Sequence, residues 1–237
     1  MVLKNENVDV IVFEEAFDNK SRAIIWEGLK DKFPFQTGKP ERNTFWKTSS
    51  GVWIVSKVPI HVLKRIYFNH ADGSDRFACK GAVLIEAEKN NSCFQLIGTH
   101  LQSDLDNKDV REIRKSQYQQ IEAELLNPFR KKNIPQFVVG DFNTIQDDSC
   151  SYQQMLNIMK VKECPVQGEL CYSYDYSSND FIIEPHHQPQ LIDYILFRED
   201  GERKVIGQTC VRVFRQKWDE KHKDLSDHFA ISAVISL

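Results

Sequence analysis

The stretch "VVGDFNTIQDD" at residues 138–148 leads from an apolar run into a turn that carries a carboxylate and a carboxamide two positions apart. Branched residues such as Val138 and Val139 are typical of a buried strand. Taken singly, the polar residues have ordinary explanations, because Asp141 suits an Asx turn and Asn143 suits a cap for a helix near "SYQQML". The later stretches "LIDYIL" and "LSDHFAI" repeat the pattern, however, and this recurrence indicates a function.

Short apolar stretches bounded by turn residues predict strands along most of the chain. They lie at 8–13, 52–56, 82–88, 94–99, 136–140, 191–197, 210–214 and 229–235. Apolar residues at helical spacing predict helices within 19–33 and 109–129, and "KNNS" between two of the strands predicts a hairpin. Most strands are not followed by a helix, so the pattern favours two packed sheets with helices outside over a doubly wound parallel sheet. With no repeat or Pro/Gly linker, residues 1–237 predict a single domain.

The composition is that of an ordinary globular protein, with 41% hydrophobic and 27% charged residues among 237. A net charge of −3 gives no overall attraction to nucleic acid or anionic lipid, although a local basic patch stays open. The apolar runs are too short to span a bilayer, and no signal-peptide pattern is visible. The six cysteines lack the CxxC spacing of zinc sites. The sequence does not decide whether the cysteines form disulfides or remain free thiols, but a core of this size needs no disulfides and favours free thiols.

Acidic, histidine and amide side chains lie at the margins of the predicted strands. Bringing them together costs desolvation and charge repulsion. A hard cation such as Mg²⁺, which prefers carboxylate oxygens, together with an anionic phosphate substrate would offset that cost. The residues concerned are Glu14, Glu15, His100, Asp141, Asn143, Asp193, Asp227 and His228.

Seven motifs occur in the order found in one known superfamily. They are "EEAFDN", "GVWIVSKVPI", "KGAVLIEAE", "IGTHLQ", "VVGDFN", "LIDYIL" and "SDHFAISA", and the similarity around them extends from Val8 to Leu237. The chain resembles the endonuclease/exonuclease/phosphatase superfamily, and within it the neutral, Mg²⁺-dependent sphingomyelinases of bacterial type. The resemblance implies an α/β (α+β) fold of the DNase I type, a four-layer α/β/β/α sandwich of two mixed β-sheets.

The resemblance also implies a reaction and a set of residues. The reaction is hydrolysis of sphingomyelin to ceramide and phosphocholine with Mg²⁺ as the cofactor, or Mn²⁺ or Co²⁺ in its place. His228 would be the general base and Asp193 would orient it, while His100 would donate to a substrate oxygen. Asp141 and Asn143 would hold the water, the phosphate or an ion. The resemblance further implies metal binding by Glu15 and Asp227, and substrate binding by Asp175 and Lys80.

Some family features have no match in this sequence. Relatives begin with an additional strand that carries a catalytic Asn, so the expected fold lacks its first strand. Ser49 and Ser50 stand where relatives have acidic residues of a peripheral metal site, and the cysteine that relatives place after "HLQ" is absent. The aromatic hairpin that relatives insert into membranes corresponds here to a charged stretch around Trp218, which is read either as a solvated loop or as a basic surface for phosphate head groups.

Several alternatives therefore stay open. The chain is a choline-phospholipid hydrolase that works at a membrane surface, a nuclease or inositol-phosphate phosphatase of the same fold, or an inactive, N-terminally truncated relative. For the first reading we expect a monomer without a transmembrane segment or a nucleic-acid partner. The relatives are secreted, but nothing in these residues shows export.

Overall fold

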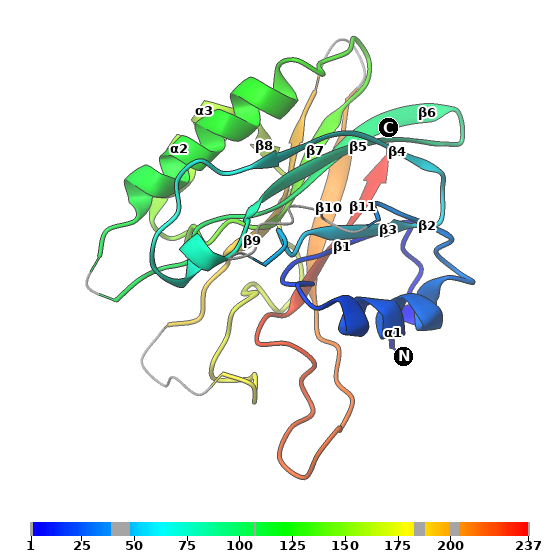
Figure 1. The fold of residues 1–237 in the computed structure, drawn as a ribbon, viewed down its shortest axis with the longest axis vertical. Coiled ribbons are helices and arrows are strands. Elements are labelled where there is room, and N and C mark those ends of the chain that lie inside the picture. Colours follow the sequence, from blue (N-terminus) through cyan, green and yellow to red (C-terminus); the bar gives the residue numbers. More distant parts are fainter. Residues whose placement is uncertain (1, 39–47, 107, 183–187, 200–203, 237) are drawn as a thin grey trace.

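The computed structural model describes residues 2–38, 48–106, 108–182, 188–199 and 204–236. A six-stranded mixed sheet forms the centre of the molecule (Figure 1). Strands β6 and β7 are parallel in this sheet, and the other neighbouring pairs are antiparallel. In spatial order the strands are β4 (Ile60–Tyr67), β5 (Gly81–Lys89), β6 (Ser92–His100), β7 (Gln136–Asp141), β9 (Asp193–Arg198) and β8 (Lys162–Glu163).

A second β-layer packs on one face of this sheet, and it consists of two antiparallel sheets instead of one mixed sheet. Val52 and Ile54 of this layer share a buried cluster with Val83, Ile85 and other residues of the large sheet. The layer has a three-stranded sheet of β1 (Val10–Phe13), β3 (Trp53–Ser56) and β2 (Phe35–Gln36), and a ribbon of β10 (Ile206–Arg212) and β11 (Ala230–Ser236).

Helices cover the outer faces of both β-layers and complete the expected α/β/β/α sandwich (Figure 1). On the large sheet lie α2 (Arg111–Ile121), the π-helical turn Glu122–Leu126 that continues it, and α3 (Ser149–Met159). Helix α1 (Asn19–Leu29) packs on the three-stranded sheet, where Leu29 shares a cluster with Trp53. Two short 3₁₀ turns, Val2–Asn5 and Gly73–Phe77, complete the regular structure.

The local predictions hold for the main strands and fail where the pattern was weak. The predicted hairpin joins β5 to β6, and its two central residues, Asn90 and Asn91, have the positive φ angles (52° and 60°) of a type I′ turn. The sequence reading missed β2, β4 and β8. It also offered the wrong cap for α3, because the side chain of Asp148, and not that of Asn143, accepts a hydrogen bond from the N–H of Ser151.

The structure also tests the expectations of free cysteines and of no membrane-spanning segment. All six cysteines are free thiols. Among the described residues, no helix has the length and apolar character needed to cross a membrane.

Candidate active site

Three polar residues form a row across neighbouring strands of the large sheet. In the register of the sheet, Asp141 at the end of β7 pairs with His100 at the end of β6 and with Asp193 at the start of β9. Because β6 and β7 are parallel, both deliver their last residue to the same edge, and antiparallel β9 meets them with its first. The repeated motifs at strand ends therefore converge as the sequence predicts.

The Gly-Asp-Phe-Asn turn fixes Asp141 in a buried position through hydrogen bonds from Asn143. The Asn143 main-chain N–H donates to Oδ1 of Asp141 at 2.7 Å, and its side-chain amide donates to Oδ2 at 2.9 Å. Gly140 has a φ of +143°, and a Cβ at this position would lie 1.9 Å from the carbonyl oxygen of Thr99. Only glycine lets the two strands approach this closely.

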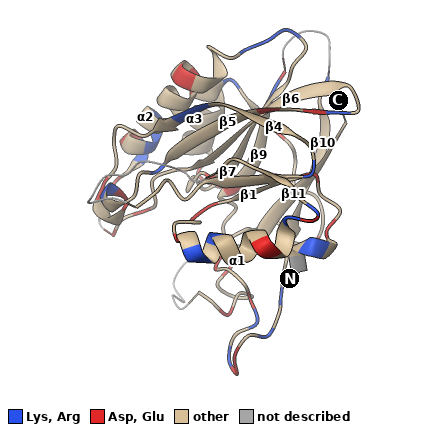
Figure 2. Cartoon of the chain, turned by 45° about the vertical axis from the view of Figure 1, so that its right-hand side comes forward, with Lys and Arg blue, Asp and Glu red and all other residues tan. Residues whose placement is uncertain are grey.

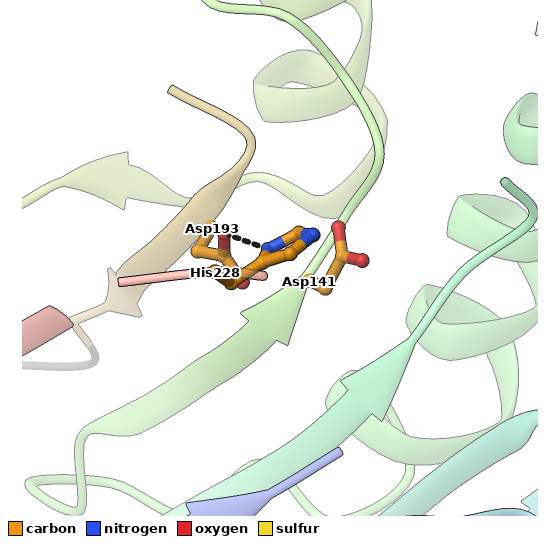
Figure 3. A group of neighbouring side chains, drawn as sticks. All are labelled: Asp141, Asp193 and His228. Carbon is orange, nitrogen blue, oxygen red and sulfur yellow. Dashed lines mark hydrogen bonds and ion pairs between the residues drawn. The ribbon is translucent and has the colours of Figure 1, made fainter. Parts of the chain in front are cut away.

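His228 reaches the row from the other β-layer. It lies just before β11, and its Nδ1 is 2.8 Å from Oδ2 of Asp193. Figure 3 shows the imidazole ring between the two carboxyl groups, with its second nitrogen on the Asp141 side. Burial is the largest single influence and lowers the pKa of His228, but the carboxylates of Asp193, Asp141 and Asp227 together outweigh it and raise the pKa to about 10.

The carboxyl groups of the site are crowded and partly desolvated. Burial, and then the Asp193 carboxylate, raise the pKa of Asp141 to about 7. The pKa of Glu14 is also raised well above its ordinary value, first by burial and then by Asp193 and Asp141. Burial is the first cause of both shifts and the neighbouring carboxylates are the second, so the ionised forms of these carboxyl groups are disfavoured unless a cation compensates them.

Glu14, which had no assigned role in the sequence, faces the site instead of Glu15. Successive side chains alternate along β1, and Val12 faces Gly98 of the large sheet. Glu14 lies on the same side, and one of its carboxylate oxygens is 3.0 Å from the Cβ position of Gly140. Glu15 is exposed and has a left-handed φ of 52°. The alternation in "VIVFEE" was the signal that could have identified Glu14.

His100 is buried and lies in contact with Lys80. Its Nε2 is 2.9 Å from Nζ of Lys80 and 3.4 Å from Oδ2 of Asp141. Burial, and then the positive charges of Lys80 and His228, hold the pKa of His100 well below its usual range. The Lys80 ammonium is buried as well, and it also donates to the Leu101 carbonyl and to Asp75. A direct contact from Lys80 to phosphate would have to break one of these three hydrogen bonds.

Asp175 and Asp227 lie outside the central group. The Asp175 carboxylate accepts hydrogen bonds from Ser177 and Ser178 within its own turn. These bonds outweigh burial, which alone raises the pKa of Asp175, and the pKa is lowered. Asp227 is exposed and influences the site through the pKa of the adjacent His228.

The geometry provides a candidate metal centre. Asp141, Asp193 and His228 each offer a ligand atom, and these atoms lie within 4.8 Å of one another. It is the one such group among the residues that the structure describes. Two carboxylates, with the nearby carboxyl group of Glu14, form an oxygen-rich set that fits a hard cation such as Mg²⁺.

Known proteins are similar to this chain in sequence and fold over almost its whole length. Residues 1–228 match the model of the Endonuclease/Exonuclease/phosphatase family. Sphingomyelinase C 2 of Leptospira interrogans serogroup Icterohaemorrhagiae serovar Lai is 31% identical over 256 residues, which cover 97% of this chain and 40% of the relative. Sphingomyelinase C of Listeria ivanovii is 29% identical over 257 residues, covering 95% of this chain and 75% of the relative. The chain spans less than half the length of two Leptospira relatives, 40% and 45%.

A solved structure shows the same fold with a metal bound. A variant of the beta toxin of Staphylococcus aureus, crystallised with bound magnesium ions, superposes with a TM-score of 0.84 at 26% sequence identity. The match covers 96% of this chain and 87% of the toxin chain.

Proposed function

We infer that this chain, which belongs to the endonuclease/exonuclease/phosphatase family, is a divalent-cation-dependent phosphodiesterase. The proposed substrate is sphingomyelin and the products are ceramide and phosphocholine. The observation that carries the reaction class is the buried row of His100, Asp141 and Asp193 with His228 across it. The substrate rests on the relatives named sphingomyelinase C, which match along nearly the whole chain.

In this proposal His228 is the general base and Asp193 positions it. The bond from Nδ1 to Asp193 leaves Nε2 facing the Asp141 side, and the proposal puts the attacking water and the phosphate on that side. Nε2 takes the proton of the attacking water when the ring is neutral. Asn143 holds Asp141 in place, and His100 donates a hydrogen bond to a phosphate oxygen.

A cation would be held by Asp141 and by a carboxylate of the Glu14–Glu15 pair, and Asp193 belongs to the same cluster. A bound Mg²⁺ neutralises charge that develops on the phosphate oxygens, and Mn²⁺ and Co²⁺ are alternatives. A positive charge beside these carboxylates would also lower the pKa of His228, because like charges disfavour the imidazolium form, and would make the imidazole a better base near neutral pH. Family motifs assign the metal contact to Glu15, whereas strand alternation favours Glu14.

A protruding loop supplies the proposed contact with a membrane surface. The segment 212–225 extends from the sandwich between β10 and β11, and it carries basic as well as acidic residues (Figures 1 and 2). Trp218 stacks on His222 and packs near Phe181, yet Trp218 remains 50% exposed. An exposed aromatic cluster beside lysine and arginine residues suits the interface of a choline-phospholipid bilayer. The enzyme acts there as a monomer in this proposal.

The test is release of phosphocholine from sphingomyelin vesicles with MgCl₂, compared with EDTA. Parallel reactions contain phosphatidylcholine vesicles, plasmid DNA or inositol phosphates. We expect Mg²⁺-dependent release from sphingomyelin and its loss in His228→Ala, with the circular dichroism spectrum unchanged. Cleavage of DNA or inositol phosphates with sphingomyelin left intact would replace the lipid substrate by one of the alternatives. No turnover of any of them would indicate an inactive relative.

A further inference from the structure

The two residues of the catalytic pair come from different β-layers. His228 lies just before β11 in the second layer, and Asp193 begins β9 in the large sheet. The 2.8 Å hydrogen bond between them therefore depends on how the two strands are held against each other. Sheet pairing does not hold them, because β9 and β11 belong to separate sheets. A third part of the chain, the segment 173–179, binds the main chain beside both residues.

Ser173 binds the start of β9 through its side chain. Its hydroxyl oxygen accepts hydrogen bonds from the main-chain N–H groups of Ile192 and Asp193, both at 3.2 Å. Ser173 is fully buried, and the two lone pairs of a hydroxyl can satisfy both donors. The Ile192 carbonyl in turn accepts from the N–H of Phe142 in the Gly-Asp-Phe-Asn turn at 3.0 Å. The hydroxyl of Ser173 therefore fixes the main chain of Asp193 next to that turn.

The same segment binds the chain on both sides of His228. After this residue, the N–H of Phe229 donates to the carbonyl of Ser173 at 2.7 Å. Before it, the side-chain amide of Asn179 donates to the carbonyls of the two preceding residues at 2.9 and 3.1 Å. Asn179 is buried, so water does not compete for these bonds. His228 is thus held at the residues that precede and follow it.

A ring contact joins the segment to the imidazole itself. The ring centroids of Tyr174 and His228 are 5.1 Å apart, and the rings are inclined at 62°, which is a favourable edge-to-face arrangement. The main chain of Tyr174 pairs with Gln190, with hydrogen bonds of 3.0 and 2.8 Å in the two directions. One short piece of chain therefore contacts the imidazole and is fastened to the segment that leads into β9.

Asp175 shapes the segment between its two ends. The Asp175 carboxylate accepts hydrogen bonds from Ser177 and Ser178, and its carbonyl accepts from the main-chain N–H of Asn179 at 3.0 Å. These bonds close a tight turn, and the turn places Asn179 on the same stretch of chain that Ser173 binds.

We propose that Ser173 and Asn179 are positioning residues that hold the main chain of Asp193 and of His228 at the separation that their hydrogen bond requires. The proposal rests on the phosphodiesterase function above and deepens it, because it names the residues that orient the general base. Both residues act through main-chain groups of the pair and do not touch the substrate.

The test begins with Ser173→Ala and a matched control. Ser173→Ala removes the hydroxyl, adds no volume and keeps the carbonyl that Phe229 binds. Ser56→Ala is the control, because Ser56 is also fully buried and its hydroxyl accepts from the main-chain N–H of Val58 at 3.1 Å. Ser56 pairs with the first residue of β1, whereas Glu14 follows the last. Asn179→Ala is a second test variant that removes the bonds on the other side of His228.

Amide hydrogen exchange, followed by NMR in the full chain, tests the bonds without turnover. We expect the N–H groups of Ile192 and Asp193 to exchange roughly five- to tenfold faster in Ser173→Ala than in the wild type, because each loses a buried partner. Ser56→Ala should leave both rates unchanged. Wild-type exchange rates at both amides in Ser173→Ala would overturn the proposal.

Kinetics separate positioning from stability. Ser173→Ala and Ser56→Ala each lose one buried hydroxyl, so both should lower the midpoint of urea unfolding. In folded protein we expect kcat to fall roughly 10- to 100-fold in Ser173→Ala and in Asn179→Ala, with KM nearly unchanged, because a misplaced base slows the chemical step and not substrate binding. Ser56→Ala should keep the wild-type kcat. A normal kcat in both test variants, or an equal loss in Ser56→Ala, would refute the positioning role.

The outcome is distinguishable from a failure of the proposed function. Kinetics use whichever substrate the wild type cleaves, so replacing sphingomyelin by another phosphodiester leaves the comparison of variants intact. Amide exchange needs no substrate at all.

Discussion

The pair of Asp193 and His228 makes the sharpest prediction, through the substitution Asp193→Asn. The carboxylate lies 2.8 Å from Nδ1 of His228 and contributes most of what raises the pKa of that ring to about 10. Asparagine keeps the size of the side chain and removes the charge. An adjacent opposite charge accounts for about 1–3 pKa units, so we expect the pKa of His228 to fall to between about 7 and 9 in metal-free protein.

The shift converts into a pH-dependent stability difference. At 1.36 kcal/mol per pKa unit, the loss amounts to about 1.4–4 kcal/mol. Because the folded pKa of His228 lies above the unfolded value, its contribution is complete below about pH 6.5 and is lost as the pH rises to about 10. Asp193 also raises the pKa of Asp141, and removing it relieves that repulsion. The pH dependence is therefore more diagnostic than the free energy of unfolding at one pH.

Two assays test this reasoning. Histidine titration by NMR in EDTA gives the pKa of His228 in both proteins, and urea unfolding at pH 6, 8 and 10 gives the free energies. We expect the difference in unfolding free energy between wild type and Asp193→Asn to shrink as the pH rises toward 10. We also expect Asp193→Asn to lower kcat roughly 10²- to 10⁴-fold, as loss of an orienting aspartate does in serine proteases. An unchanged His228 pKa, or turnover close to that of the wild type, would refute the pairing as the basis of catalysis.

Three further predictions use single residues of the site and the loop. Glu14→Gln should raise the Mg²⁺ concentration needed for half-maximal activity more than Glu15→Gln does, measured by metal titration; the reverse order would return the ligand role to the family motif position. Gly140→Ala should lower the free energy of unfolding by about 1–3 kcal/mol in urea denaturation, because its Cβ collides with the Thr99 carbonyl; an unchanged midpoint would contradict the close approach. Trp218→Ala should reduce sedimentation with sphingomyelin vesicles while hydrolysis of a soluble phosphodiester stays normal; equal binding would remove the loop from the membrane interface.

Much of the fold was predictable because its strong signals are local. The "KNNS" turn fixed the β5–β6 hairpin, since two asparagines tolerate the positive φ angles that a tight turn requires. β4 escaped notice because its sequence "IHVLKRIY" mixes charged and apolar residues, and its burial varies along its length. The division of the second β-layer into two sheets has no local signal either, because strand pairing depends on contacts between distant segments.

The site was predictable to the level of motifs but not to the level of atoms. Asp141, Asp193 and His228 gather as the motif order implies, because sheet register fixes their neighbours. Motif matching assigned Glu15 where strand alternation turns Glu14 inward. Asp75 was not singled out in the sequence, because its hydrogen bonds with Lys80 and with the distant Ser103 are visible only in the structure.

The charges of the site explain why these residues stay together. Glu14, Asp141 and Asp193 cannot all ionise in a partly buried cluster without a counter-charge, and in metal-free protein the raised pKa values of Glu14 and Asp141 show protons in that role. His228 supplies a further positive charge and is thereby unsuited to act as a base. A bound dication would favour loss of both kinds of proton, so cation binding and deprotonation of His228 would be linked equilibria. It follows that Mg²⁺ should bind more tightly as the pH rises from 6 to 8, and that calorimetry in buffers of different ionisation enthalpy should detect proton release. Binding without proton release would mean that the cation lies elsewhere.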